Sequence, residues 1–149
     1  MTISWTIKHF NELNTSELYD IMQLRLEVFS VEQNCAYQDA DGKDFYAHHI
    51  MGCNDEGKLM AYSRILPAGI SFVEISIGRV ITSTKARKTG SGKELMQKSL
   101  DFIQSHYGTV PVRIGAQCYL TRFYSGFGFA IASPEYLEDN IPHVEMLRL

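Results

Sequence analysis

Residues 87–92 form a short loop whose composition suits the binding of a pyrophosphate group. The loop follows an apolar, strand-like run at residues 72–82 and precedes a helix-like run at residues 93–107. Glycine lets a backbone come close to a ligand, and the unpaired N–H groups at the start of a helix attract an anion. The pattern predicts an anion site, although a glycine-rich connection without a ligand is also compatible with it. The six residues are Arg87, Lys88, Thr89, Gly90, Ser91 and Gly92.

The spacing of this loop excludes two common nucleotide-binding motifs. A Walker A loop needs glycine at position 87 and serine or threonine at position 94, where the chain has Arg87 and Glu94. A dinucleotide-binding fingerprint needs a third glycine at position 95, which is occupied by Leu95. What remains is the pattern Arg-x-x-Gly-x-Gly between a strand and a helix.

Polar side chains also interrupt apolar elements nearer the start of the chain. Arg25 breaks the apolar face of an expected helix, and Glu32 lies seven residues later on the same side, so we predict that the two lie together. They could lie over a cleft or form a structural ion pair at the helix end. His48 and His49 point to opposite faces of their strand, so at most one can face a given cleft, and a purely structural histidine is the alternative.

Hydrophobic patterning predicts the elements that must position these residues. Strands are expected at residues 3–10, 45–52, 59–66, 73–82, 110–116 and 141–149. Helices are expected at residues 93–107, at 119–127, and after a cap at Asn14, Thr15 or Ser16. A strand, helix and strand from residue 73 to 116 imply a parallel crossover, with the loop 87–92 at the carboxyl end of its strand. The predicted fold class is α/β with a mixed sheet.

Size and composition fit one domain spanning residues 1–149. The net charge of −3 gives no basic footprint for nucleic acid, and no apolar run is long enough to cross a membrane. Cys35, Cys53 and Cys118 lack metal-ligand spacing, so we expect reduced thiols and no metal site. The aspartates of residues 34–44 alternate as in a calcium loop, but the closing glutamate is missing from the sequence. We therefore expect a cytoplasmic protein without nucleic-acid or membrane partners, and a homodimer is compatible with the sequence.

Two motifs together resemble the GCN5-related N-acetyltransferase (GNAT) superfamily. The loop 87–92 resembles its coenzyme A pyrophosphate loop, and residues 123–129, Phe-Tyr-Ser-Gly-Phe-Gly-Phe, resemble the segment that follows its fifth strand. The ElaA-like subfamily is resembled through residues 24–33, 77–80, 115–117 and 138–143. The chain departs from the pattern at Lys88, Ala36 and Asn140, where glycine, proline and glycine are common. Asparagine tolerates a left-handed backbone, so Asn140 is a mild departure.

This resemblance implies a GNAT-type fold and an acetyl-CoA-dependent N-acetyltransferase. The fold is a twisted, mixed, mostly antiparallel sheet with a parallel strand-helix-strand core and flanking helices. The reaction is direct transfer of an acetyl group to a primary amine of a small molecule or peptide. Tyr124 matches the tyrosine proposed in the family to protonate the departing thiolate, and a role in binding the thioester or in packing is the alternative. The expected cofactor contacts are the loop 87–92, Val80, Ile81, Thr82, Gln117 and Tyr124.

The resemblance gives more than one candidate for the general base and several candidates for the acceptor site. The family often places a carboxylate on the strand that here contains Glu74, which shares a strand face with Ser76, and Glu32 is the rival. The candidates for binding the acceptor are Arg25, Glu32, His48, Arg79 and His143. A non-catalytic acyl-CoA sensor or a structural interaction domain are other functions with the same fold, and the presence of Tyr124 favours an enzyme.

Overall fold

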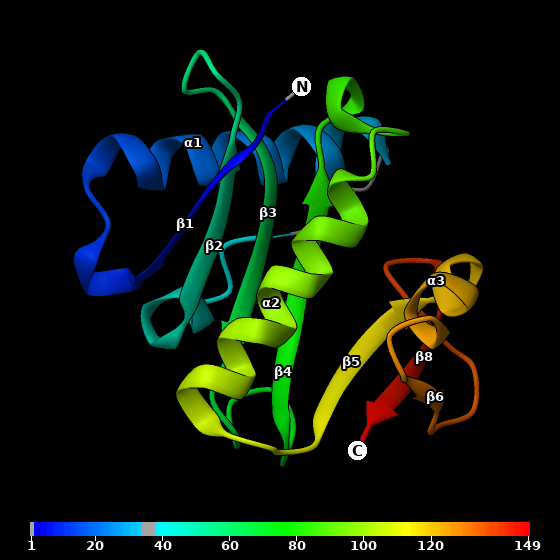
Figure 1. Ribbon diagram of the computed structural model, residues 1–149. Coiled ribbons are helices and arrows are strands. Elements are labelled where there is room, and N and C mark those ends of the chain that lie inside the picture. Colours follow the sequence, from blue (N-terminus) through cyan, green and yellow to red (C-terminus); the bar gives the residue numbers. More distant parts are fainter. Residues whose placement is uncertain (1, 34–37) are drawn as a thin grey trace.

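The strands form one mixed sheet, shown in Figure 1. The computed structural model describes residues 2–33 and 38–149, and within them the strand order is β1-β2-β3-β4-β5-β8-β6, with β7 paired to β8. The pairing of β4 with β5 is parallel and the other pairings are antiparallel, which confirms the predicted sheet. The strands are β1 Ser4–His9, β2 His48–Cys53, β3 Leu59–Leu66, β4 Ile75–Thr82, β5 Val112–Gln117, β6 Ala130–Ile131, β7 Tyr136–Glu138 and β8 Ile141–Arg148.

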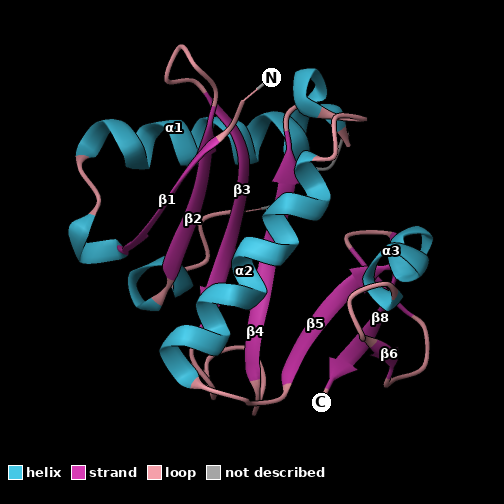
Figure 2. Cartoon of the chain, viewed as in Figure 1, coloured by secondary structure: helices cyan, strands magenta, loops and turns pink. Residues whose placement is uncertain are grey.

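Two helices cover opposite faces of the sheet (Figure 2). Helix α1 (Thr15–Arg25) lies behind the strands and continues as a π-helical segment at Leu26–Glu32, whereas α2 (Ser91–Tyr107) crosses the front. Two adjacent residues of β2 belong to the separate cores on the two faces. Ile50 packs in the core with α2, and Met51 packs in the core with α1. The short helix α3 (Thr121–Ser125) lies beside β5 and β8.

Local sequence explains where α1 and α2 begin. Asn14 caps α1 by accepting from the backbone N–H of Glu17 at 2.8 Å, and the Glu17 side chain accepts in return from the Asn14 N–H at 3.0 Å. Asn14 was one of three predicted caps. Gly90 precedes α2 in a left-handed conformation with φ of 84°, which a residue with a side chain rarely adopts. The predicted start of this helix at residue 93 is therefore two residues too late.

Several predicted boundaries differ from the structure at short elements. Lys43–Tyr46 form a 3₁₀ turn, so the strand predicted from residue 45 begins at His48. The helix predicted at residues 119–127 is a 3₁₀ turn at Cys118–Leu120 followed by α3. The strands β6 and β7 were not predicted, because two or three residues are too few to show alternation.

Strands β4 and β5 are paired at one end and separate toward the other (Figure 1). They pair at Ile75–Val112 and Ser76–Arg113, whereas β4 continues to pair with β3 as far as Thr82. The β3–β4 register shifts between Tyr62 and Arg64, at a bulge where Arg79 has a positive φ of 49°. The end of β4 that leads to the loop 87–92 is therefore not paired with β5.

Cys53 and Cys118 are free thiols, and the prediction for Cys35 falls outside the described residues. No helix in the described ranges is long and apolar enough to span a bilayer.

Candidate active site

The loop 87–92 lies where β4 ends and α2 begins, as predicted. A Cβ atom built on Gly90 would meet no atom within 4 Å, and one on Gly92 would meet only the Phe123 ring, at an ordinary 3.9 Å. Packing among the described residues therefore does not require glycine at position 92. The hydroxyl of Thr89 hydrogen-bonds the backbone carbonyl of Ala86 and lies 2.7 Å from the Ser91 hydroxyl, which orders the turn.

Arg87, the first residue of this loop, forms an ion pair with Glu32. Its guanidinium donates to both carboxylate oxygens, with Nη2 2.9 Å from Oε2, and it also donates to the backbone carbonyl of Thr82. The hydrogen bond from Arg87 lowers the pKa of Glu32. The predicted pairing of Glu32 with Arg25 is therefore wrong, because the π-helical segment turns Glu32 toward the loop.

Arg25 is instead the centre of a buried ion-pair cluster. Its side chain is 0% exposed, its Nε donates to Asp39 at 2.7 Å, and its Nη1 donates to Asp44 at 2.7 Å. A second arginine, Arg64 of β3, joins Asp44 at 3.1 Å and Asp41 at 2.8 Å. Sequence reasoning considered these aspartates only as calcium ligands. Their alternation, together with an arginine inside the apolar run 59–66, was the signal for a buried charge cluster.

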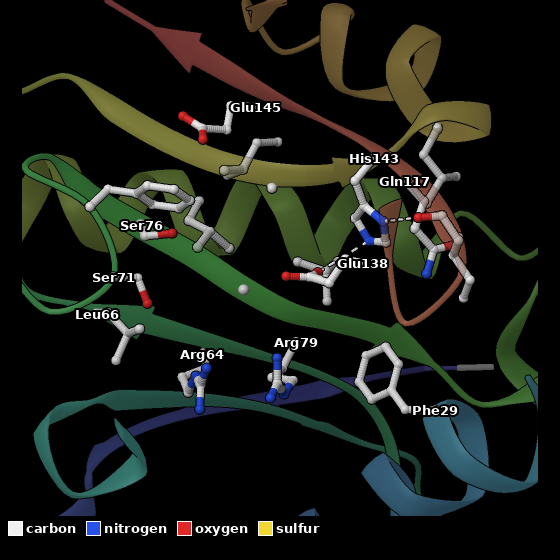
Figure 3. Close-up of a pocket in the computed structure, with 18 of the residues that line it drawn as sticks. Phe29, Arg64, Leu66, Ser71, Ser76, Arg79, Gln117, Glu138, His143 and Glu145 are labelled. Atoms are coloured by element: carbon white, nitrogen blue, oxygen red, sulfur yellow. Dashed lines mark hydrogen bonds and ion pairs between the residues drawn. The ribbon is translucent and has the colours of Figure 1, made fainter. Parts of the chain in front are cut away.

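A pocket of about 710 Å³ opens where β4 and β5 separate, and Figure 3 shows its lining. This volume lies in the range of small-molecule sites. Five of the predicted site residues line the pocket together, namely Arg79, Val80, Gln117, Tyr124 and His143. The loop 87–92 lies outside this lining, with Ile81 and Thr82 leading from the pocket toward it.

The two walls of the pocket differ in charge (Figure 3). The wall on the side of β3 and β4 contains three cations and one carboxylate, namely Lys43, Arg64, Arg79 and Asp41. The wall on the side of β5, β7 and β8 contains three carboxylates and a histidine, namely Glu138, Asp139, Glu145 and His143. Arg64 and Arg79 are ion-paired to aspartates, whereas Lys43 donates to the Ser71 hydroxyl at 2.8 Å. Arg64, Lys43 and Glu138 were not predicted as site residues, because they come from segments that are distant from one another in sequence.

Tyr124 reaches the pocket from α3 and is 7% exposed. Its ring packs edge-on against Phe123 and Phe129, at centroid distances of 5.2 and 6.1 Å. Burial raises the pKa of the Tyr124 phenol to about 12, so the hydroxyl keeps its proton at neutral pH. The arrangement places a protonated donor in a concave site.

Four of the residues predicted for catalysis or acceptor binding do not line the pocket. Glu74 precedes β4 instead of lying within it, and Arg113 donates to both of its oxygens, at 3.0 and 3.2 Å, which lowers its pKa. His48 lies on the other face of the sheet, 4.7 Å from Phe102 and 4.9 Å from His106 between ring centroids.

Arg25 and Glu32 are held in the ion pairs described above, so these side chains do not converge on one acceptor cleft.

A mixed sheet that opens beside a glycine-containing helix start, with a tyrosine in the opening, is the architecture of GNAT acetyltransferases. A family model of the acetyltransferase (GNAT) domain matches residues 20–148. The chain therefore belongs to the GNAT family and is an N-acetyltransferase by class.

Within this family the similarity is to ElaA and its relatives. Protein ElaA of Escherichia coli K12 is 46% identical over 149 residues, which cover 98% of this chain and 96% of ElaA. A Schizosaccharomyces pombe protein designated UPF0039 is 41% identical over 145 residues, covering 97% and 95% of the two chains. The crystal structure of an acyl-CoA N-acyltransferase from Pseudomonas aeruginosa superposes with a TM-score of 0.95 and 41% identity, covering 99% of this chain and all of that one. The chain is thus an ElaA-like member of the family.

Proposed function

We propose that this chain transfers an acetyl group from acetyl-CoA to a primary amine of a small molecule or peptide, and that residues 1–149 act as one catalytic domain. The single observation that carries the proposal is the pocket between β4 and β5, which contains Tyr124 and lies beside the end of β4 that leads to the loop 87–92. The printed description of the Pseudomonas aeruginosa neighbour, an acyl-CoA N-acyltransferase, supports an acyl-CoA donor.

In the proposed reaction, different parts of acetyl-CoA bind at the two ends of this region. The N–H groups at the start of α2 and the side chains of Arg87 and Lys88 bind the pyrophosphate. The end of β4 lacks a β5 partner, so its backbone groups at residues 80–82 hydrogen-bond the pantetheine arm. The thioester then lies beside Tyr124, which protonates the sulfur as it leaves. The charged walls of the pocket accommodate a small polar amine or the amino group of a peptide.

Replacing Gly92 with aspartate tests the cofactor site. Gly92→Asp places a negative charge at the start of α2, where it repels the pyrophosphate while fitting beside Phe123. Acetyl-CoA binding measured by calorimetry should weaken by at least ~10-fold, a difference of ~1.4 kcal/mol. Gly92→Ala is the matched control, since it adds the same Cβ without charge. Unchanged affinity in a folded Gly92→Asp protein would reject the proposed phosphate site.

The acetyl transfer itself is tested by thiol release. Wild-type protein is mixed with acetyl-CoA and with small amines, amino acids or short peptides, and free coenzyme A thiol is followed over time. We expect acceptor-dependent release with formation of the acetylated amine by mass spectrometry. Acetyl-CoA binding with no release for any acceptor class would favour the non-catalytic sensor.

A further inference from the structure

The transfer requires a base, because an ammonium group has no lone pair with which to attack a thioester. The two carboxylates suggested by the sequence are poorly placed for this task. Glu32 and Glu74 lie outside the pocket lining and each accepts two hydrogen bonds from an arginine. Within the pocket, the carboxylates of Asp41 and Glu145 are ion-paired to Arg64 and Arg113. The hydrogen bonds from arginine lower the pKa values of Glu32, Asp41 and Glu74, which weakens these three carboxylates as proton acceptors.

The His143 side chain differs from these carboxylates in its contacts within the pocket. It projects from β8 into the pocket opposite Gln117 of β5, is 6% exposed, and stacks on Tyr136 with 5.9 Å between ring centroids. Its Nδ1 lies 2.7 Å from the backbone carbonyl of Ile141. A carbonyl can only accept, so Nδ1 carries a hydrogen and Nε2 of the neutral ring carries the lone pair.

The lone-pair nitrogen of His143 faces a carboxylate. Nε2 lies 3.4 Å from Oε2 of Glu138, whose side chain is 61% exposed and drawn toward the pocket in Figure 3. A neutral Nε2 cannot donate to this oxygen, but a protonated one forms an ion pair with it. Glu138 is therefore placed to pair with His143 once Nε2 carries a proton.

We propose that His143 is the general base that deprotonates the acceptor ammonium, and that Glu138 is a positioning residue that stabilises the resulting imidazolium. This assignment rests on the proposed acetyl transfer and names the residue that activates the acceptor. The stacking on Tyr136 and the bond to the Ile141 carbonyl fix the ring so that Nε2 is the atom presented to the acceptor.

The protons and electrons balance over the whole reaction. The ammonium gives one proton to Nε2 of His143 and becomes an amine, whose lone pair forms the C–N bond at the thioester carbon as the C=O pair moves to oxygen. Collapse of this intermediate breaks the C–S bond, and sulfur leaves with the electron pair and takes the Tyr124 proton. The nitrogen then gives its second proton to the Tyr124 oxygen, which restores the phenol. The products are an amide and free thiol, and His143 releases one proton to water.

The pH dependence of this step depends on every charged group that faces the imidazole. These are Tyr136, Glu138 and Asp139 from β7 and its turn, Glu145 from β8, and Tyr124 from α3. The cations Lys43, Arg64 and Arg79 line the opposite wall, where Asp41 also lies. Of these groups, Glu138 has a carboxylate oxygen 3.4 Å from Nε2.

The kinetic test compares two acceptor probes. Ethanolamine is an ammonium ion at neutral pH and needs a base, whereas hydroxylamine is largely unprotonated and does not. For His143→Gln, kcat/KM with ethanolamine should fall ~10²–10⁴-fold, and with hydroxylamine it should change little. The variant rate with ethanolamine should rise with pH as free amine accumulates. His106→Gln, at an exposed histidine of α2, is the matched control and should behave as wild type.

Replacing Glu138 tests the positioning role separately. Glu138→Gln should move the acidic inflection of the ethanolamine pH–rate profile to lower pH, because the imidazolium loses its partner. A merely structural role would change the rate without moving the inflection. A wild-type rate and profile in His143→Gln, or an unmoved inflection in Glu138→Gln, would overturn the corresponding assignment.

A measurement without turnover distinguishes failure of this assignment from failure of the proposed function. Long-range ¹H–¹⁵N spectra of the whole protein with bound acetyl-CoA should show the Nδ1–H tautomer of neutral His143 at pH 8. They should also show protonation at Nε2 as the pH falls, at lower pH in Glu138→Gln. A dominant Nε2–H tautomer overturns the base assignment even if acetyl transfer is confirmed. A wild-type enzyme that transfers acetyl to no amine rejects the function, whatever the tautomer.

Discussion

At the scale of single residues, the pocket keeps a weak acid protonated by excluding water from it. Tyr124 is held between Phe123 and Phe129, and burial raises its pKa to about 12. A thiolate is a weaker base than this phenolate, so in the proposed transfer the proton moves to sulfur as the C–S bond breaks, coupled to return of a proton from the acetylated nitrogen to the Tyr124 oxygen. The same burial prevents ionisation of Tyr124 from limiting activity anywhere near neutral pH.

Tyr124→Phe tests this role, because the ring and its packing remain while the proton is lost. We expect kcat to fall by ~10²–10⁴-fold with little change in acetyl-CoA affinity. Steady-state kinetics and calorimetry measure the two quantities. Tyr119→Phe is the matched control, since that side chain is 75% exposed and does not line the pocket.

An equal loss of acetyl-CoA affinity in Tyr124→Phe would instead mean that the hydroxyl binds the thioester. A marked drop in melting temperature would mean that it stabilises the fold.

Single residues were predictable where a short motif contains them. The loop 87–92 and Tyr124 belong to contiguous patterns, and both lie where the motifs imply. The partners of Arg25 and Glu32 could not be read from spacing. Arg87 is 55 residues from Glu32 in sequence, and Asp39 is 14 residues from Arg25. Such pairs are set by how loops cross the sheet, which no local periodicity records.

At the scale of elements, the turn between β7 and β8 shapes one wall of the pocket. Asp139 and Asn140 link the strands in two residues with φ of 51° and 63°, which is the left-handed backbone of a type I′ hairpin. Glu138 and His143 lie on either side of this turn, so its geometry sets their separation. Asn140 stands where glycine is common in the family, and asparagine serves there because it tolerates positive φ.

Asn140→Val should lower the free energy of unfolding by about 1–2 kcal/mol, because a β-branched residue is strained at positive φ. Asn140→Gly, the matched control, should lie within about 0.5 kcal/mol of wild type. Urea unfolding followed by circular dichroism measures both. Equal stability of the valine and glycine variants would contradict the left-handed turn.

Elements were predictable in proportion to their length. The strand at residues 59–66 was predicted with its observed bounds, and α2 was predicted to within two residues at its start, because long periodic runs carry a strong signal. The strands β6 and β7 are short and owe their existence to pairing with β8. The π-helical segment after α1 has the apolar pattern of an ordinary helix, which explains why Glu32 was predicted to face the wrong way.

At the scale of the whole molecule, a buried set of charges ties the loop at residues 38–44 to both α1 and the sheet. Arg25 comes from α1, Arg64 from β3 and Arg79 from β4, and they share Asp39, Asp41 and Asp44. Burial opposes ionisation of Asp41 and Asp44, but hydrogen bonds from Arg64 and Arg25 prevail. They lower the pKa of Asp41 to about 2 and the pKa of Asp44 below its usual 3.8.

This cluster predicts acid-sensitive stability. Because the pKa of each carboxylate is lower in the folded state, its contribution is complete above about pH 3.8 and is lost as the pH falls toward 2. Asp44→Asn should cost ~3 kcal/mol at neutral pH by leaving Arg25 partly unpaired, and should reduce the loss of stability at low pH. Urea unfolding between pH 2 and 7 tests both effects, with Asp55→Asn in the β2–β3 turn as control.

If Asp44→Asn matches wild type in stability throughout this pH range, the cluster adds nothing to folding. Its role would then be confined to shaping the pocket wall.

The separation of β4 from β5 also has a consequence for the stability of the backbone. A strand that lacks ladder bonds on one side opens at lower free energy than one paired on both, so we expect local opening at the end of β4 that has no β5 partner. A ligand arm that fills this position supplies the missing hydrogen bonds and stabilises the folded state by mass action. In the function proposed above, the cofactor arm acts as a temporary strand that pairs with the end of β4 only while acyl-CoA is bound.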